Sequence, residues 1–430
     1  MSNDRPNVVM IIVHDIGQHL GCYGAGLDTP ELDSMAERGV RFTNYHCTAA
    51  QCSPSRGSIS TGKYPHRNGL VGLAHIGWEI DEAERKLPQI LNDAGYETFL
   101  FGHQHESADS ASLGYTNIMK SGNKARQSTE CFIEHAAELA KLDKPFFASL
   151  GWVEPHRPYG VEGYDNDPPD AVTLLPWLPD KPGIREDIGG LNGLVYEVDR
   201  CVGEVAKCLE ETGLAENTLF IFTTDHGIAM PRAKGTCFDP GTKTALIMHM
   251  PGRYEGGRVY DELLSNVDFL PAICELTGAT PPDDIDGRSF LPLLDGKPYE
   301  EHDHIFTEMT YHDRYNPMRA IRTRRFKYIR NFGERPLVFL PKDIFDGLAG
   351  EEMKDEYYAD QRPEEELFDL EADPLEMNDV AGDDAYADVL KELRGRVDTW
   401  MRETNDRLLD GEWPPSDKQR ERAETDATPN

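Results

Sequence analysis

The sequence predicts an α/β protein with a large, mostly parallel sheet sandwiched by helices and a smaller C-terminal α+β domain. Apolar runs of strand length alternate with segments whose apolar residues recur at helical spacing, which is typical of parallel strands covered on both faces. After about Gly296 the strand-like segments become shorter and more charged. We therefore expect a main domain over residues 1–297, a second domain over 298–413 and a solvated tail over 414–430.

The main domain opens with an uninterrupted apolar run, Asn7–Val13 (NVVMIIV), which predicts the first strand. A helix follows, with Thr29 or Asp28 as cap and Pro30 in its first turn, and Gly39 ends it. Apolar residues recur every three or four positions between Leu194 and Leu209, which predicts a helix there that ends at Gly213. By the same signals, further helices are expected at 87–94, 128–141 and 269–276, and further strands at 97–101, 145–151, 218–223 and 244–250.

The second domain is expected to contain short strands at 321–331 and 367–370 and a helix at 385–404. Strands in a charged setting suit a small sheet with one solvated face. The sequence shows no internal repeats.

The charge balance excludes several classes of partner. The chain has 430 residues with 44 basic and 77 acidic side chains, a net charge of −33. Such a chain should repel nucleic acid and anionic membranes, because binding there needs clustered Lys and Arg. No segment has the roughly 18 apolar residues of a membrane span. We expect neither nucleic acid nor membrane as a partner.

The acidic residues are spread along the chain, and only 16 of the 44 basic residues are Lys. A diffuse acidic surface with few lysines suits a protein kept soluble at high salt, where self-repulsion is screened. Our hypothesis is a halophilic protein, with an ordinary acidic enzyme as the alternative. A low-salt optimum for solubility or activity would count against halophily. The start MSNDRPNVVM shows no secretion signal, so we expect a cytoplasmic location.

The eight cysteines lie far apart and contain no CxxC pair, so they form neither a disulfide framework nor a zinc motif. Most are expected to be small buried residues. Cys52 is the exception, because of the segment around it.

Polar residues that can ligate a metal or transfer protons follow four of the predicted strands. In open α/β sheets such strand ends meet at one edge, where ligands bind. Any one of them alone is more typical of a cap or loop residue, but four at one edge indicate a single polar cleft. They are His14 and Asp15, His103 and His105, Glu154 and His156, and Asp225 and His226.

Two of these strand ends suggest a divalent cation. Asp15 and Asp225 attract hard cations, while His14 and His226 shift the preference from Ca²⁺ toward Mn²⁺ or Zn²⁺. The alternative for each pair is a loop hydrogen bond.

The segment from Cys52 to Gly62 (CSPSRGSISTG) is the most specific in the chain. It resembles the sulfatase family of the alkaline-phosphatase-like superfamily, whose pattern Cys (or Ser)-x-Pro-Ser-Arg followed by Thr-Gly is met in full. Further family landmarks extend the resemblance over about residues 5–380. They are Leu20–Gly24, Gly102–His105, Pro155–His156, Thr224–Gly227, Lys234–Thr236, Asn266–Asp268, Asp286–Pro292 and Glu366–Leu370.

The resemblance implies a mechanism. A separate formylglycine-generating enzyme oxidises the family's cysteine, here Cys52, to formylglycine, whose hydrate is the nucleophile. One divalent metal, Ca²⁺ in the family, would be bound by His14, Asp15, Asp225, His226 and the modified Cys52. Asp225 is predicted to act as the base that activates the attacking hydroxyl, and Arg56 to hold the hydrate. Lys234 and protonated His103 would neutralise the charge of the sulfate oxygens. His156 or Lys234 would protonate the leaving group, and His105 would act as the base in the step that releases sulfate.

Two positions depart from the family pattern. His14 stands where the family has an Asp, and His103 stands where it has a Lys. The first change removes a negative charge from the metal site, and the second replaces a permanent cation with a group that titrates near neutrality. They keep open a phosphonate monoester hydrolase or phosphodiesterase, and a non-catalytic binding homologue.

Within the family, His66–Leu70 and the Asp225–Ile228 run look most like the sulfamidase (N-sulfoglucosamine sulfohydrolase) branch. The resemblance thus implies hydrolysis of sulfate esters or sulfamates, with a sulfated small molecule or oligosaccharide as substrate. Loop residues His19, His75, Trp78, Glu79 and Arg157 could contact that substrate or serve as ordinary loop residues.

Overall fold

The computed structural model describes residues 5–425 and is built around one large sheet with the strand order β5-β4-β6-β1-β7-β8-β2-β9. The strand β8 runs antiparallel to both its neighbours, and the other pairings are parallel. The expected large, mostly parallel sheet is therefore confirmed. Its strands are β1 (Asn7–Val13), β2 (Val40–Phe42), β4 (Glu97–Gly102), β5 (Asn117–Ile118), β6 (Phe146–Trp152), β7 (Thr218–Thr224), β8 (Leu246–His249) and β9 (Arg258–Tyr260), with β3 (Tyr45–His46) and β10 (Leu264–Ser265) forming a separate parallel pair.

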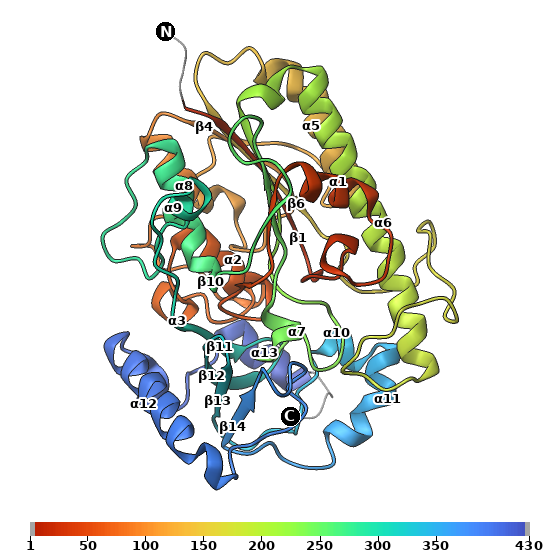
Figure 1. Ribbon diagram of the computed structural model, residues 1–430, viewed down its shortest axis with the longest axis vertical. Coiled ribbons are helices and arrows are strands. Elements are labelled where there is room, and N and C mark those ends of the chain that lie inside the picture. The colour runs from red at the N-terminus through yellow and green to blue at the C-terminus, as the bar shows by residue number, and fades with distance from the viewer. Residues whose placement is uncertain (1–4, 426–430) are drawn as a thin grey trace.

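Helices cover both faces of this sheet, with α1, α5 and α6 on one side and α2, α8 and α9 on the other (Figure 1). From Val8 onward, the strand β1 is apolar throughout because both of its faces are buried. Val9, Ile11 and Val13 pack into one core, while Val8, Met10 and Ile12 pack into the other. The helices of this domain are α1 (Pro30–Arg38), α2 (Cys52–Thr61), α3 (Pro65–Asn68), α4 (Leu87–Asp93), α5 (Ala125–Leu139), α6 (Pro182–Glu211), α7 (Asp239–Thr242), α8 (Phe269–Thr277) and α9 (Leu291–Leu294).

The helix α6 begins at Pro182, well before the predicted start at Leu194. Its first half contains Gly189, Gly190 and Gly193, which indicate a loop by propensity alone. In the structure these glycines let the 159–167 segment approach closely. A Cβ atom on Gly190 would lie 2.3 Å from the Gly160 backbone nitrogen. Tertiary packing therefore overrides the local preference here.

The C-terminal domain is an antiparallel sheet in the order β11-β12-β13-β14, with helix α12 packed against it (Figure 1). The single strand expected over 321–331 is wrong. The chain turns between Arg322 and Phe326, where Thr323 and Phe326 bond to each other, so that two strands share the segment. The elements are β11 (Ile305–Tyr311), β12 (Tyr315–Arg322), β13 (Phe326–Asn331), β14 (Glu365–Asp369), α10 (Lys342–Phe345), α11 (Leu348–Tyr357), α12 (Ala387–Glu403) and α13 (Asp417–Thr425).

Part of the segment expected to be a solvated tail docks on the protein. Ser416 Oγ donates to the Ile76 carbonyl at 2.6 Å, and Gln419 Nε2 donates to the Asp313 carbonyl at 2.7 Å. Gln419 is buried, and its side-chain oxygen accepts from Trp78. These contacts join the C-terminal segment to both domains. Residues 426–430 of the expected tail lie outside the described residues.

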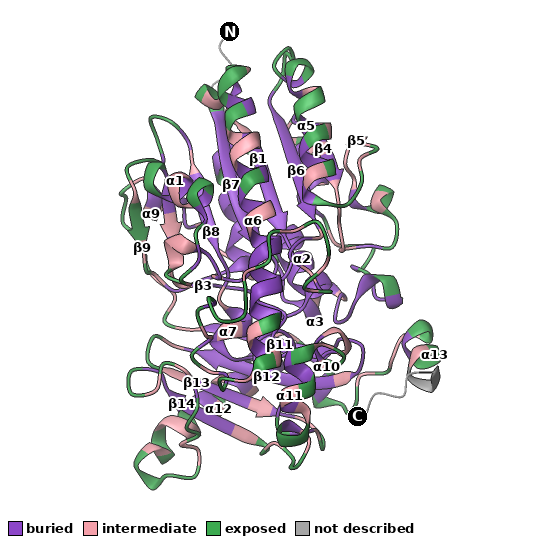
Figure 2. Ribbon diagram, turned by 90° about the vertical axis from the view of Figure 1, so that its right-hand side faces the viewer, coloured by how far each residue is buried: buried purple, intermediate pink, exposed green. Residues whose placement is uncertain are grey.

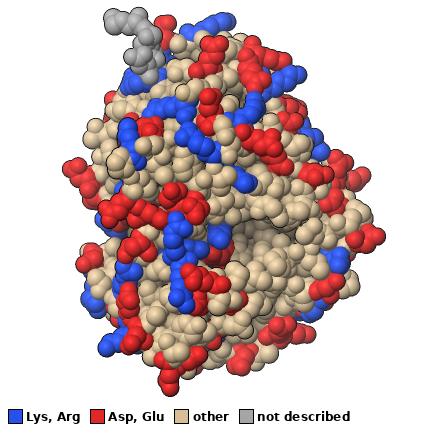
Figure 3. Space-filling model, viewed as in Figure 1, with Lys and Arg blue, Asp and Glu red and all other residues tan. Residues whose placement is uncertain are grey.

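The surface of the protein is strongly acidic but not uniformly so. On the face shown in Figure 3, basic side chains are interspersed among the acidic ones, and a hollow in that face is bordered mostly by uncharged residues. Within the described part of the chain, no helix combines the length and the apolar character needed to cross a membrane.

The C-terminal domain contains a buried charge network centred on Arg319. Its Nε lies 2.5 Å from Asp406 Oδ2 and 3.2 Å from Glu308 Oε2, and Glu308 also binds the ring of His66 from the main domain at 2.8 Å. All these groups are buried, so each charge depends on its partner. The network therefore ties the second domain to the first.

Replacing Arg319 with methionine is expected to lower the free energy of unfolding by about 3–5 kcal/mol, because two carboxylates lose their buried cation. The measurement is urea unfolding followed by circular dichroism. Arg394→Met is the matched control, since Arg394 pairs with Glu365 at 2.6 Å in a half-exposed position. That control should lose no more than about 1 kcal/mol. Equal losses in both variants would contradict the assignment.

Candidate active site

The strands of the main sheet end at one level. The last residue of β1, Val13, pairs with Trp152 of β6 on one side and with Thr224 of β7 on the other. The residues that follow these strands therefore meet at the carboxyl edge, which faces the C-terminal domain (Figure 2). Residues predicted from the sequence to meet at this edge do lie close together there.

Cys52 is the first residue of helix α2 and is buried. Its Sγ lies 3.3 Å from His226 Nε2 and 3.8 Å from Asp15 Oδ1. Burial raises the pKa of this thiol, with Asp15 and Asp225 adding to the effect and Lys234 opposing it. A reactive cysteine needs a lowered pKa, so the site is not arranged to use Cys52 as a thiolate.

Asp225 holds the loops after β1 and β7 together. Its Oδ1 accepts the backbone N–H groups of Asp15 at 3.1 Å and His226 at 2.9 Å. Its Oδ2 accepts from Arg56 Nε at 2.9 Å and lies 3.1 Å from His14 Nδ1. Burial raises the pKa of Asp225, but His226, His14 and Arg56 outweigh it and hold this pKa well below its ordinary value. The carboxylate is therefore a weak proton acceptor, which counts against the predicted role of base and suits it to holding a cation.

Asp15 adopts φ = +49°, a backbone conformation uncommon outside glycine. This conformation is held by the bond from its N–H to Asp225 and directs its carboxylate into the cluster. One oxygen lies 3.0 Å from His226 Nε2, and the other accepts from Lys234 Nζ at 2.8 Å. Asp15 therefore lies between the Cys52 side and the Lys234 side of the site.

Lys234 lies buried between two carboxylates from different domains. Its Nζ is 2.8 Å from Asp15 Oδ2 and 2.8 Å from Asp343 Oδ2, and Asp343 belongs to helix α10. Burial lowers the pKa of Lys234, but the two carboxylates overcome this effect and raise it well above its ordinary value. Lys234 is therefore a fixed positive charge. Asp343 was not predicted, because one acid among 77 in a charged region gives no signal.

His156 is oriented by its neighbours. Its Nδ1 lies 2.7 Å from the Arg157 carbonyl, which can only accept, so Nδ1 carries the proton. Its Nε2 lies 3.3 Å from Lys234 Nζ and accepts from it. The two residues predicted to protonate the leaving group thus lie side by side.

The charges of the cluster balance only when His226 is protonated. Burial lowers the pKa of His226, but Asp225 and Asp15 raise it well above its ordinary value. Asp15, Asp225 and Asp343 are then matched by Lys234, Arg56 and the His226 imidazolium. A divalent cation that replaced the His226 proton would leave one net positive charge, which suits an anionic substrate.

The donor set fits a divalent metal. Ligand atoms of His14, Asp15, Cys52 and Asp225 all lie within 4.8 Å of one another, and His226 contacts two of these residues. Nε2 of His14 is buried without a hydrogen-bond partner among the described residues, while its Nδ1 lies 3.1 Å from Asp225 Oδ2. The five predicted metal ligands are therefore brought together, and a mixture of carboxylates and imidazoles is a donor set that Mn²⁺ or Zn²⁺ accepts more readily than Ca²⁺ does.

Arg56 lies one turn into α2 and is buried. Its Nε is committed to Asp225, while its two terminal nitrogens have no hydrogen-bond partner among the described residues. Burying a guanidinium whose N–H donors lack acceptors costs free energy, so binding an acceptor there is favourable. The structure thus places Arg56 where it can hold Asp225 and still bind an oxygen.

His103 and His105 lie against His14, with ring centroids 4.9 Å and 5.7 Å from its ring. Burial, followed by the neighbouring His14 and Arg56, lowers the pKa of His103 to about 2. The direction of this shift favours a neutral His103 and gives no support to the protonated His103 predicted from the sequence. Burial likewise lowers the pKa of His105 well below its ordinary value.

The loop residues considered for substrate contact divide into two groups. Arg157 is committed to structure, because it pairs with Asp187 at 2.6 Å and donates to the Ala229 carbonyl at 2.8 Å. Trp78 is also committed to structure, because its indole N–H donates to the side chain of Gln419 on α13 at 3.3 Å. His75, in contrast, touches the site, with its Nδ1 2.9 Å from His105 Nε2.

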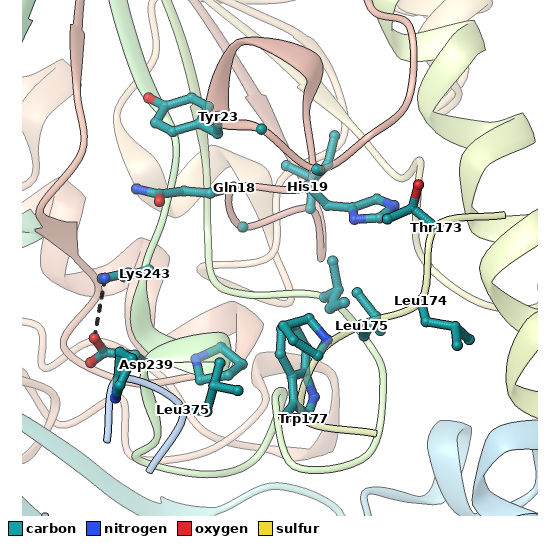
Figure 4. Close-up of a pocket in the computed structure, with 18 residues that line it drawn as sticks. Gln18, His19, Tyr23, Thr173, Leu174, Leu175, Trp177, Asp239, Lys243 and Leu375 are labelled. Carbon is teal, nitrogen blue, oxygen red and sulfur yellow. Dashed lines mark ion pairs between the residues drawn. The ribbon is translucent and has the colours of Figure 1, made fainter. Parts of the chain in front are cut away.

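A cavity of about 460 Å³ adjoins the same loops but excludes every predicted site residue (Figure 4). Ile16 and Gly17 follow Asp15 into its wall, Ile228 follows His226, and Trp177 lies opposite. The pair Lys243–Asp239, 3.3 Å apart, forms its polar end. His19 lines it, but its Nε2 is bound to Asn192 at 2.8 Å. The cavity is thus separate from the Cys52 cluster.

Acid is expected to destabilise the metal-free protein. Burial and the charge of Arg56 lower the pKa of His14 from its ordinary 6.5 to about 4, so the unfolded chain takes up this proton first. Stability is therefore retained above pH 6.5 and decreases as the pH falls toward 4, by about 3 kcal/mol from His14 alone. Urea unfolding at neutral pH and at about pH 4.5 measures this. His14→Gln should lose part of the dependence, and His135→Gln, on α5, should keep it. An unchanged dependence in His14→Gln would contradict the account.

The fold and the site together place a buried cysteine at a helix N-terminus among carboxylates, cations and imidazoles, an arrangement that suits an anionic substrate beside a divalent cation. Comparison with known proteins identifies the family. The sequence model of the family described as "Sulfatase" matches residues 6–279, and that of "N-sulphoglucosamine sulphohydrolase, C-terminal" matches residues 232–340. The chain belongs to the sulfatase family and is a sulfuric ester hydrolase.

Among curated proteins, the chain is 31% identical to an ulvan-active sulfatase of Formosa agariphila, over 94% of this chain and 82% of the relative. It is 27% identical to human N-sulphoglucosamine sulphohydrolase, over 94% of this chain and 91% of that protein. Among solved structures, a 2-O GAG sulfatase has a TM-score of 0.75 at 21% identity, covering 97% of this chain and 96% of that one. The resemblance stated from the sequence is thereby confirmed.

Proposed function

We propose that the protein is a formylglycine-dependent, metal-dependent sulfatase that hydrolyses sulfate esters or sulfamates of sugars. The observation that carries the proposal is the position of Cys52, at the start of α2 within the full family segment and in contact with Asp15 and His226. A thiol with a raised pKa is a poor nucleophile there, and this supports conversion of Cys52 to another group.

Two absent groups would complete the site. Formylglycine formed from Cys52 by a maturation enzyme would, once water has added to its aldehyde, supply a nucleophilic hydroxyl at position 52. A divalent cation held by His14, Asp15, Asp225 and His226 would supply positive charge opposite the sulfate oxygens.

The residues of the chain perform the remaining tasks. Lys234 presents a fixed ammonium group to the anion, and the unused donors of Arg56 are available to an oxygen near position 52. His156 Nε2 lies 3.3 Å from Lys234 Nζ, so His156 is the member of this pair that would protonate the departing oxygen or nitrogen, while Lys234 keeps its charge. Asp343 holds Lys234 in place from the second domain. Both domains therefore contribute to one site.

The names of the relatives support a sugar substrate. Two are an ulvan-active sulfatase and N-sulphoglucosamine sulphohydrolase, and a solved structure with a TM-score of 0.71 contains its substrate D-glucosamine-2-N,6-O-disulfate. The match of residues 232–340 to the N-sulphoglucosamine sulphohydrolase C-terminal family favours testing sulfamates first.

The experiment compares kcat/KM for N-sulfoglucosamine, 6-O-sulfoglucosamine and 2-O-sulfated disaccharides, alongside sulfate, phosphate and phosphonate esters of one aryl leaving group. We expect sulfate or sulfamate to be cleaved faster than the matched phosphorus esters. A phosphonate monoester hydrolase with a TM-score of 0.71 has the same fold, so a preference for phosphonate is the reversal that would overturn the proposal.

A further inference from the structure

We propose that His14, His103 and His105 form a separate, nitrogen-only binding site for a transition metal ion of the Zn²⁺ class. One ligand nitrogen from each imidazole lies within 4.8 Å of the other two. The ring centroids are 4.9 Å apart for His14 and His103, 5.7 Å for His14 and His105, and 5.5 Å for His103 and His105. These three residues are called the histidine trio below.

The topology explains why the trio assembles. His14 follows β1, whereas His103 and His105 follow β4, and β6 lies between these strands. All three strands end at the carboxyl edge, so their following residues face one another above β6. The trio therefore rests on rigid parallel strands, which favours a preformed site.

The trio has nitrogens that nothing in the described part of the chain occupies. His14 is 1% exposed, and its Nε2 has no hydrogen-bond partner there. His105 Nδ1 is likewise buried without a partner among those residues. A buried polar atom without a partner is costly, and a metal ion would satisfy such atoms.

The second nitrogen of two trio members has the kind of neighbour that orients a metal-bound imidazole. His105 Nε2 lies 2.9 Å from His75 Nδ1, which leaves Nδ1 of His105 as its ligand atom. His14 Nδ1 lies 3.1 Å from Asp225 Oδ2, which leaves Nε2 of His14 for the trio. Ligating histidines commonly have such outer partners, which fix the ring orientation and raise the basicity of the ligand.

The donor set distinguishes the trio from the carboxylate group beside it. Three imidazoles and an open position are typical of Zn²⁺ and related transition metals, whereas oxygen ligands suit Ca²⁺. The two groups meet at His14, whose Nδ1 faces Asp225. We infer that the trio binds its ion through His14 Nε2 while Asp15, Asp225 and His226 stay available for a second cation, independently of turnover.

The test is a Co²⁺ titration of the full-length Cys52→Ala protein in excess Ca²⁺, followed by visible absorption, so that no thiolate can serve as a ligand. We expect one Co²⁺ per chain, and loss of stoichiometric binding in His103→Asn and His105→Asn. His75→Asn should weaken binding by about 10-fold to 100-fold, as outer partners do. His135→Asn, on α5 away from the trio, is the matched control and should bind normally.

Two results would overturn the proposal. One is unchanged Co²⁺ binding in both His103→Asn and His105→Asn. The other is displacement of Co²⁺ from the starting protein by Ca²⁺, which would place the ion among the carboxylates. If the variants do not fold, X-ray absorption of the Zn²⁺-loaded Cys52→Ala protein decides the matter. Three imidazole ligands support the trio, and a first shell of mostly oxygen ligands contradicts it.

Discussion

Replacing Cys52 with alanine is expected to lower the rate of sulfate release by about 10⁴-fold or more, because no nucleophile can form at position 52. The alanine leaves the first turn of α2 intact, and the lost sulfur contacts His226 and Asp15 without any strong bond. The fold should therefore survive. The measurement is kcat on the best sulfated sugar, with circular dichroism as the test of folding.

Cys47→Ala is the matched control for this variant. Cys47 is also buried, and its Sγ contacts the Gly241 carbonyl at 3.7 Å instead of Asp15 or His226. It should keep nearly full activity. Sulfate release by Cys52→Ala at a rate close to that of the unaltered protein would show that the reaction uses another nucleophile.

Replacing Lys234 with methionine is expected to lower kcat by about 100-fold to 1,000-fold, because a fixed donor opposite the anion is lost. The same change leaves Asp15 and Asp343 buried without their cation, so it should also cost about 3–5 kcal/mol of stability. Steady-state kinetics and urea unfolding measure the two effects separately.

Two further variants distinguish catalysis from stability at this position. In the double variant Lys234→Met, Asp343→Asn, one stranded charge is removed, so stability should partly recover while kcat stays low. Lys207→Met removes an exposed lysine that lies 3.7 Å from Glu211 and should change neither quantity. Recovery of kcat in the double variant would show that Lys234 acts only through structure.

The central strands of the main sheet could be predicted from the sequence because they are buried on both faces, whereas the short strands β2, β5 and β9 were not predicted. The run at 7–13 and the later runs at 97, 145 and 218 are continuous and apolar, and the structure places a strand at each. The start of α6 could not be predicted, because Gly189 and Gly190 serve a close contact that local propensity does not register. The β12–β13 turn was missed because it contains no Gly or Pro.

Some residues of the site could likewise be predicted from the sequence, and others could not. Those that come directly after a buried strand, such as Asp15 and Asp225, could be placed from the sequence, because parallel strands end at one edge. Asp343 could not, because it reaches Lys234 only through the packing of the two domains. The lowered pKa of His103 depends on burial and on nearby charges, which the sequence does not reveal.

The most direct test of the proposed mechanism is peptide mass spectrometry of Cys52 in protein from its own host. Trypsin releases Phe42–Arg56, which contains both Cys47 and Cys52, so Cys47 serves as an internal thiol standard. The mechanism predicts a peptide lighter by about 18 Da, the thiol-to-aldehyde change, with only one alkylatable cysteine, at position 47. A peptide of unaltered mass that alkylates at both cysteines would contradict formylglycine catalysis and favour a non-catalytic binding protein.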